Sequence, residues 1–128
     1  MPLRVLIVDD NRDAADCLGL LLGLLGATSQ VCYGGADALA HAPEFRPHVG
    51  LLDIDMPGMS GLELARRLRV LLGRRRVMLV AVTGVSSEEA RAATAAAGFD
   101  WHLTKPVDGT TLAGRLLAFH RTTFPADG

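Results

Sequence analysis

The stretch Val5–Asp10 reads VLIVDD, four apolar residues followed at once by two acidic ones. A later stretch, Val49–Asp55, reads VGLLDID and places Asp53 after a second apolar run. Short apolar runs that end at polar residues predict strands buried on both faces, as in a parallel sheet. Because parallel strands have their carboxyl ends at one edge of the sheet, we expect Asp9, Asp10 and Asp53 to meet there.

The rest of the chain alternates between strand-like and helix-like patterns. The strand-like runs are Arg4–Val8, Thr28–Tyr33, Val49–Leu52, Val77–Val82 and Trp101–Thr104. Five helices are expected. The first runs from a cap at Asp10 or Asn11 to about Leu25, the second covers Gly35–Ala42, and the third begins at Ser60, with Glu63 at capping-box spacing. The fourth runs from Ser86 or Ser87 to Gly98, and the last runs from Thr110 to about His120 after a cap at Asp108. This alternation predicts an α/β fold of βαβ units. We expect a flavodoxin-like, doubly wound, parallel five-stranded sheet in the order 2-1-3-4-5, which puts its binding point between strands one and three.

Length and composition limit the possible classes of protein. The 128 residues, 49% of them hydrophobic, suit one domain, which we expect over residues 1–121 with a tail or linker start over 122–128. A net charge of -1 gives no electrostatic support for direct nucleic-acid binding. No targeting signal is visible and the longest apolar segment is too short to cross a bilayer, so a cytoplasmic location without membrane insertion is expected. Cys17 and Cys32 lack metal-ligand spacing and are expected to be buried, reduced thiols.

The acidic cluster indicates a divalent cation. Two carboxylates about 4 Å apart repel by roughly 4 kcal/mol at an effective dielectric of 20, and a bound cation removes this cost. Mg²⁺ takes one or two carboxylates and keeps its other positions for water and phosphate. We expect Asp10 and Asp53 as direct ligands, Asp9 acting through water, and the backbone carbonyl of Asp55 as a further ligand. Mn²⁺ is the expected substitute.

Two further polar residues follow later strands. Thr83 ends the run VMLVAVT, and Lys105 stands before a proline in HLTKPV. An aspartate can accept a phosphoryl group as an acyl phosphate, and such a transfer depends mainly on positioning and charge neutralisation. Asp53 is therefore the candidate acceptor, with Lys105 neutralising the phosphoryl group and the Thr83 hydroxyl donating a hydrogen bond to it.

This set of residues resembles the receiver domain of two-component response regulators. The shared motifs, present in the same order, are Asp9-Asp10, LLDIDMPGMSG around Asp53, Thr83-Gly84 and Lys105-Pro106. The resemblance implies a phosphoacceptor signalling domain, not an enzyme, which receives its phosphoryl group from a histidine kinase or a histidine phosphotransfer domain. VDDNRDAADCL, FRPHVGLLDI and AGFDWHLTKPVD are most similar to receivers attached to hybrid sensor histidine kinases.

The resemblance also implies a switch and a docking surface. Phosphorylation would move Thr83 and change the face built from the Ser86–Ala97 helix, the last strand and the last helix. His102 stands where receivers often have a Tyr or Phe that takes part in this switch. A cis Lys105–Pro106 bond is expected as well. The residues expected to meet the phosphodonor are Asn11, Ala14, Ala15, Leu18 and Pro106.

The first helix is the least expected feature, because no charged residue occurs between Asp16 and Asp37. Helical spacing predicts a core face made of Ala14, Cys17, Leu18, Leu21, Leu22 and Leu25. Leu20 and Leu24 then lie on the outside, flanked by Gly19 and Gly23. Two exposed leucines are ordinary; the functional alternative is a docking stripe for a helical partner or for a second copy of the chain.

Two other classes of protein share part of this pattern. Asp53 and Asp55 resemble the D-x-D core of haloacid-dehalogenase-type phosphatases, which use an aspartyl phosphate, but that motif normally ends the first strand. A flavodoxin-like FMN module would need a Gly/Ser/Thr-rich phosphate loop after the first strand, where this chain has acids.

Overall fold

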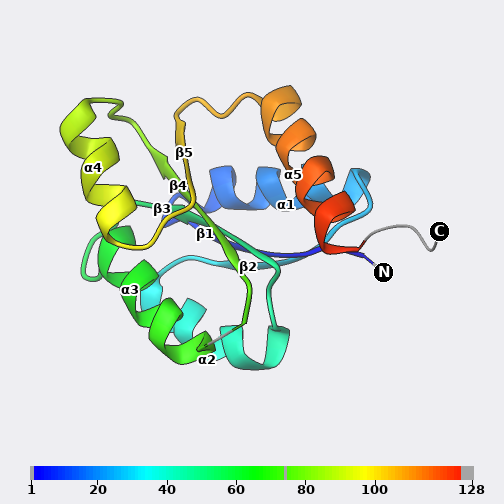
Figure 1. Cartoon of the computed structure of the whole chain (residues 1–128), viewed down its shortest axis with the longest axis horizontal. Helices are drawn as coiled ribbons and strands as arrows, with labels where there is room; N and C mark the ends of the chain where they lie inside the picture. Colours follow the sequence, from blue (N-terminus) through cyan, green and yellow to red (C-terminus); the bar gives the residue numbers. More distant parts are fainter. Residues whose placement is uncertain (1, 74, 125–128) are drawn as a thin grey trace.

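The computed structural model describes residues 2–73 and 75–124, and these form one parallel sheet with helices on both sides (Figure 1). The strands are β1 (Arg4–Val8), β2 (Thr28–Cys32), β3 (Val49–Asp53), β4 (Met78–Thr83) and β5 (Trp101–Thr104). Their order is β2-β1-β3-β4-β5, and every neighbouring pair is parallel. The predicted fold class, strand number and strand order are therefore confirmed.

The helices divide the core into two layers. They are α1 (Arg12–Leu24), α2 (Gly35–Phe45), α3 (Gly61–Leu72), α4 (Glu88–Ala96) and α5 (Gly109–Thr123). Helices α1 and α5 cover one face of the sheet, and α2 and α3 cover the other (Figure 1). Strands β1 and β3 lie inside the sheet and are almost fully buried, which fits sequences that are apolar except for Arg4 at the start of β1 and Asp53 at the end of β3.

The helix starts follow the capping residues. In each of four helices the N-cap side chain accepts a backbone N–H from the first turn; these caps are Asn11, Ser60, Ser87 and Asp108. The capping box expected at α3 is only half formed. Ser60 accepts the Glu63 N–H at 3.3 Å, but the Glu63 carboxylate pairs with Arg67 at 2.9 Å instead of returning to the cap.

Some element ends differ from the predicted ones. Helix α2 does not stop at Ala42 but continues through Pro43 to Phe45, because a proline near the last turn removes only one backbone hydrogen bond. Helix α5 runs to Thr123, past the expected domain end at residue 121. The remainder of the expected tail, residues 125–128, lies outside the described residues. Among the described helices, none has the length and apolarity needed to cross a membrane.

The buried face of α1 is only partly the predicted one. Leu22 is fully buried and Ala14, Leu18 and Leu21 are half-buried, as predicted, but Cys17 is exposed and Leu25 is 47% exposed. Ala15, which was not expected on this face, is fully buried. The prediction that both cysteines are buried is therefore wrong for Cys17 and right for Cys32. Gly19 faces the sheet, since a Cβ atom there would lie 3.1 Å from a methyl group of Val31. It therefore allows α1 to pack closely on β2 and does not flank an outer stripe.

The exposure of the two outer leucines is as predicted. Leu20 is 73% exposed and Leu24 is 86% exposed. A helix with apolar residues on nearly every side has no sharp apolar face, so its sequence does not fix which side meets the core.

Candidate functional site

The three predicted acids meet at the carboxyl edge of the sheet. Asp9 follows β1 and Asp53 ends β3, and the register Val8↔Leu52 brings these two strand ends together. Asp9 and Asp53 are only 4% and 3% exposed, while Asp10 is exposed. One carboxylate oxygen of each acid lies within 4.8 Å of the others. The prediction that these three acids meet at one edge of the sheet is thus confirmed.

Backbone groups fix the two buried carboxylates. The Asn11 N–H donates to Asp9 Oδ1 at 2.9 Å, and the Asp55 N–H donates to Asp53 Oδ1 at 3.3 Å. Helix α3 begins close behind Asp53, since the Gly61 N–H donates to the Ile54 carbonyl at 3.0 Å. A Cβ atom at Gly61 would collide with the Asp53 carbonyl oxygen, so this close approach requires glycine.

Lys105 reaches the acids from the loop after β5. Its Nζ lies 3.3 Å from Asp53 Oδ1 and 3.6 Å from Asp9 Oδ2. The Lys105 N–H donates to the Thr83 carbonyl at 2.7 Å, which ties the loop to the end of β4. The Lys105–Pro106 peptide bond is cis, as the resemblance implies.

The surroundings shift the acid–base properties of these groups. The pKa of the Asp53 carboxyl is raised to about 6, first by burial and second by the negative charge of Asp9, while Lys105 opposes both effects. For Lys105, burial lowers the pKa, but the charges of Asp53 and Asp9 outweigh it, and the pKa lies above its usual value. Buried carboxylates that repel each other and face one ammonium group form a site suited to bind additional positive charge.

The donor chemistry of the acid pocket, defined here as Asp9, Asp10 and Asp53, fits Mg²⁺. All three offer carboxylate oxygens, the hard ligands this ion prefers, and Asp10 lies on the solvent side, where bound water can complete a coordination shell. The Asp55 side chain, in contrast to those of Asp9 and Asp53, is exposed. Direct ligation by Asp10 and Asp53, a water link to Asp9 and a carbonyl ligand from Asp55 stay predictions.

Thr83 is buried beside Asp53 at the end of β4. Asp53 pairs with Val82 in the sheet, and Thr83 is the next residue. Its hydroxyl oxygen accepts the Val85 N–H at 3.2 Å, so the hydroxyl hydrogen remains available for an acceptor. This is the position from which it could donate to a group on Asp53.

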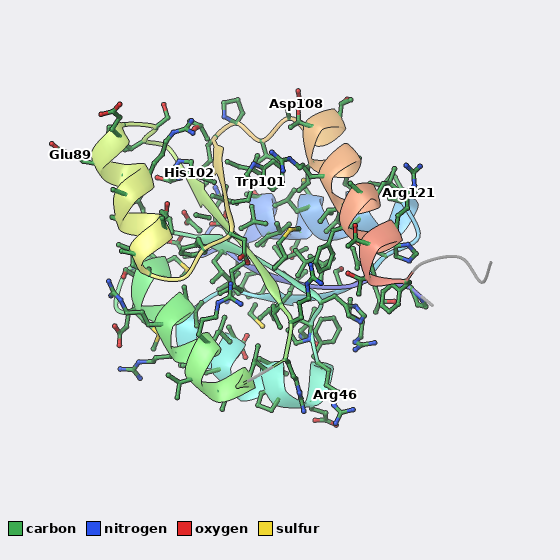
Figure 2. All side chains as sticks on the ribbon, in the orientation of Figure 1. Arg46, Glu89, Trp101, His102, Asp108 and Arg121 are labelled. Carbon is green, nitrogen blue, oxygen red and sulfur yellow. The ribbon has the colours of Figure 1, made fainter. Side chains whose placement is uncertain are left out.

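His102 lies on the α4 side of β5. Its Nδ1 is 3.4 Å from the Thr94 hydroxyl, and its Nε2 is buried without a hydrogen-bond partner among the described residues. The neighbouring Trp101 points to the other side, where the Arg115 guanidinium lies 4.5 Å from its ring centroid (Figure 2). The imidazole is therefore half-buried against α4 and does not stand free in water. Its part in switching stays a prediction.

A groove of about 500 Å³ opens beside the acid pocket. Its lining residues are Asp9, Asn11, Ala14, Leu18, Val82, Lys105, Pro106 and Val107. Four of the five expected docking residues line it. The fifth, Ala15, is fully buried against the sheet, so the expectation that it contacts a partner is wrong. Val82 and Val107 also line the groove but were not predicted from the sequence, although they are adjacent to the motif residues Thr83 and Pro106.

The fold and this constellation agree with comparisons to known proteins. The family model of the response regulator receiver domain matches residues 5–117. The chain therefore belongs to the response regulator receiver family.

Individual relatives and solved structures are similar over most of the chain. An uncharacterised 14.6 kDa protein of Leptolyngbya boryana is 36% identical over 125 residues, covering 98% of this chain and 95% of the relative. Response regulator MprA of Mycolicibacterium vanbaalenii is 37% identical over 128 residues; these are 100% of this chain but 54% of MprA, so the chain spans about half the length of that relative. The CheY4 chemotaxis protein of Vibrio cholerae has a TM-score of 0.87 at 27% identity, covering 93% of this chain and 99% of that one.

Proposed function

We propose that this receiver domain is a phosphoacceptor in a two-component phosphorelay and takes a phosphoryl group from a phosphohistidine onto Asp53 with Mg²⁺. The observation that carries the proposal is the meeting of Asp53 with Asp9, Asp10 and Lys105 at one point of the sheet edge. The phosphodonor would be a histidine kinase or a histidine phosphotransfer domain.

The residues divide the transfer between them. An oxygen of the Asp53 carboxylate attacks phosphorus, the P–N bond breaks, and its electron pair stays on the donor imidazole, which takes up a proton. Lys105 offsets negative charge on the phosphoryl oxygens, and the Thr83 hydroxyl donates to one of them. Asp10, Asp53 and the Asp55 carbonyl, with Asp9 through water, would hold Mg²⁺, which when bound supplies the remaining positive charge. Mn²⁺ would substitute for it.

Protonation of Asp53 would compete with Mg²⁺ binding and with phosphotransfer. In the metal-free chain, burial and the charge of Asp9 raise the pKa of its carboxyl to about 6, so the carboxylate predominates above that pH. A protonated Asp53 can neither bind the ion nor attack phosphorus.

The groove beside the acid pocket offers the docking site. Ala14, Leu18, Pro106 and Val107 give it an apolar wall directly next to Lys105. A helix that carries the phosphohistidine could pack on this wall and bring its ring to Asp53. We also propose that the domain is cytoplasmic and does not bind nucleic acid directly. Its parent chain could be a hybrid histidine kinase.

Phosphorylation would then change the face formed by α4, β5 and α5. Thr83 would move toward the new phosphoryl oxygens, and His102 would respond to the space left between β4 and α4. One solved structure, 27% identical to this chain with a TM-score of 0.82, is of the BeF3-activated DrrB receiver domain, and this supports the proposed switch.

Labelling with a small phosphodonor tests the proposal. After incubation with acetyl phosphate and Mg²⁺, intact-mass spectrometry should show one added phosphoryl group on the wild-type chain. Asp53→Asn should show none, and excess chelator should abolish labelling of the wild type. Asp55→Asn, which removes an exposed acid two residues away, is the matched control and should still be labelled. Undiminished labelling of Asp53→Asn would contradict the assignment.

The match to the receiver family over residues 5–117 favours this function over both alternatives. A haloacid-dehalogenase-type phosphatase would release phosphate from an external ester in many turnovers, and an FMN module would retain a yellow cofactor. Neither result is expected of the purified chain.

A further inference from the structure

A second cluster of potential metal ligands lies outside the acid pocket. The sulfur of Cys32, a carboxylate oxygen of Asp37 and a ring nitrogen of His41 all lie within 4.8 Å of one another. Cys32 is the last residue of β2, and Asp37 and His41 are one turn apart on α2. The proposed phosphotransfer uses none of these three residues.

The fold brings these side chains together from two elements. Cys32 is fully buried, in the same core cluster as Ala38 and Ala42 of α2. Asp37 and His41 lie on the same helix and are only partly covered, with side chains 49% and 48% exposed. His41 Nδ1 is 3.1 Å from Asp37 Oδ1 and 2.8 Å from the Asp37 carbonyl oxygen. The cluster therefore has a sulfur atom at its base and a side that is open to water.

We propose that Cys32, Asp37 and His41 bind a Zn²⁺ ion, with water as the fourth ligand. Thiolate, imidazole and carboxylate are the ligands that Zn²⁺ takes in proteins, and three protein ligands with one open position form a common zinc arrangement. The standard bond lengths place neighbouring tetrahedral ligands about 3.3–3.6 Å apart. The three ligand atoms already lie within 4.8 Å of one another, so only a small approach is needed to reach this spacing. Mg²⁺ would not compete, because it prefers oxygen ligands alone.

Binding requires the release of one proton. Burial, together with the nearby Asp37 carboxylate, raises the pKa of the Cys32 thiol to about 12, so the free residue is a thiol. The S–H bond breaks as the sulfur–metal bond forms, and the proton leaves to solvent. His41 binds through a ring nitrogen as the neutral imidazole, and Asp37 binds as a carboxylate.

The bound ion would cross-link α2 to the end of β2. The carbonyl of Cys32 accepts the Asp9 N–H at 3.2 Å, so the cross-linked strand end lies directly beside the acid pocket. Hydrogen exchange of this amide should slow when the ion binds, because the local opening that exposes it becomes less frequent.

Cobalt substitution provides the test, with Co²⁺ as the probe and the whole chain held in excess Mg²⁺ to fill the acid pocket. One equivalent of Co²⁺ should produce thiolate-to-cobalt charge transfer in the near ultraviolet and tetrahedral d–d bands in the visible. Zn²⁺ should remove both signals, and about one proton should be released per ion bound. Cys17→Ser is the matched control for the exposed thiol and should keep both signals, as should Asp53→Asn.

Variants of the three ligands decide the outcome. Cys32→Ser should lose the charge-transfer band, and Asp37→Asn and His41→Ala should each weaken Co²⁺ binding at least about tenfold. The last two change exposed side chains, so they remain informative if Cys32→Ser does not fold. Absence of a thiolate band in the wild type, its loss in Cys17→Ser, or wild-type affinity in both Asp37→Asn and His41→Ala would overturn the proposal.

Discussion

Asp53 is held in its folded position against electrostatic cost. It is 3% exposed, its carboxylate lies close to that of Asp9, and the Lys105 ammonium group forms ion pairs with both. The raised pKa expresses this cost, because the folded chain binds the Asp53 proton more tightly than the unfolded chain does. The favourable contribution of the protonated form is fully present below pH 3.8 and is lost as the pH rises through about 6.

Replacing this carboxylate should stabilise the fold at neutral and higher pH. In Mg²⁺-free buffer, Asp53→Asn should raise the free energy of unfolding by about 1–3 kcal/mol at about pH 8, since an amide carries no charge. The gain should shrink as the pH falls from 6 towards 4. Urea unfolding of both chains over this range measures the difference. Asp55→Asn, the control, should follow the wild type, and an Asp53→Asn gain that does not change with pH would contradict the assigned cause.

The acid pocket could be predicted at the level of single residues, whereas the thiol cluster could not. Each acid of the pocket directly follows an apolar run, so strand order alone brings Asp9 and Asp53 together. Cys32 and His41 come together only because β2 and α2 pack with a particular rotation. Sequence spacing shows that Asp37 and His41 share a helix face, but it does not show which strand residue lies beneath them.

At the scale of elements, α1 shows where sequence patterns fail. Its N-cap and length were predicted, but its buried face was predicted only in part, because leucines occur on nearly every side of the helix. Gly19 faces β2, where a Cβ atom would lie 3.1 Å from a methyl group of Val31, and the local pattern of α1 carries no signal of this contact. The outer leucines Leu20 and Leu24 could still be identified, because they lie opposite both the predicted and the observed buried residues.

The exposed stripe on α1 should take part in partner recognition. Leu20→Glu with Leu24→Lys should slow phosphotransfer from a cognate histidine donor at least about tenfold, about 1.4 kcal/mol, or abolish self-association. Labelling by acetyl phosphate should stay intact, because this reagent needs no docking surface. Val70→Glu, which changes an 83% exposed residue on α3, is the control and should leave both properties unchanged. Unchanged transfer kinetics and unchanged oligomeric state in the Leu20/Leu24 variant would show that the stripe is only surface.

The face formed by α4, β5 and α5 should respond to a phosphoryl mimic. Beryllofluoride with Mg²⁺ should shift the backbone amide resonances of Thr83, of α4 and of β5, while those of the distant end of α2 stay in place. His102→Ala should reduce the response in α4, because the imidazole lies against Thr94. Two-dimensional NMR spectra of both chains measure this, and identical spectra of that face with and without the mimic would rule out the switch.

At the scale of the whole molecule, strand patterns predict the topology of the sheet but not the ends of its elements. The buried strands β1 and β3 are apolar except for Arg4 and Asp53 at their ends, and the alternation with helices leaves few topologies, so the sheet order could be predicted. Element ends could not be predicted, since α2 continues past Pro43 and α5 reaches Thr123 without a local sequence signal for either extension.

Mg²⁺ should stabilise the folded domain before any phosphorylation. The ion binds the acid pocket only in the folded state, and at a hundred times its dissociation constant the gain is about 2.7 kcal/mol. Thermal unfolding with and without Mg²⁺ should show this, and Asp10→Asn should lose most of it. Asp13→Asn, which removes an exposed acid from the first turn of α1, should keep the full effect. Equal shifts in the wild type and in Asp10→Asn would exclude Asp10 as a ligand.

The central claim is that Asp53 itself becomes the acyl phosphate. Borohydride reduction of the phosphorylated wild-type chain converts an aspartyl phosphate into homoserine, which tandem mass spectrometry locates in the sequence. Our account predicts homoserine at position 53, formed only when Mg²⁺ was present during labelling. Homoserine at Asp9, Asp10 or Asp55 instead, or an unmodified Asp53 in a chain that carries phosphate, would contradict it.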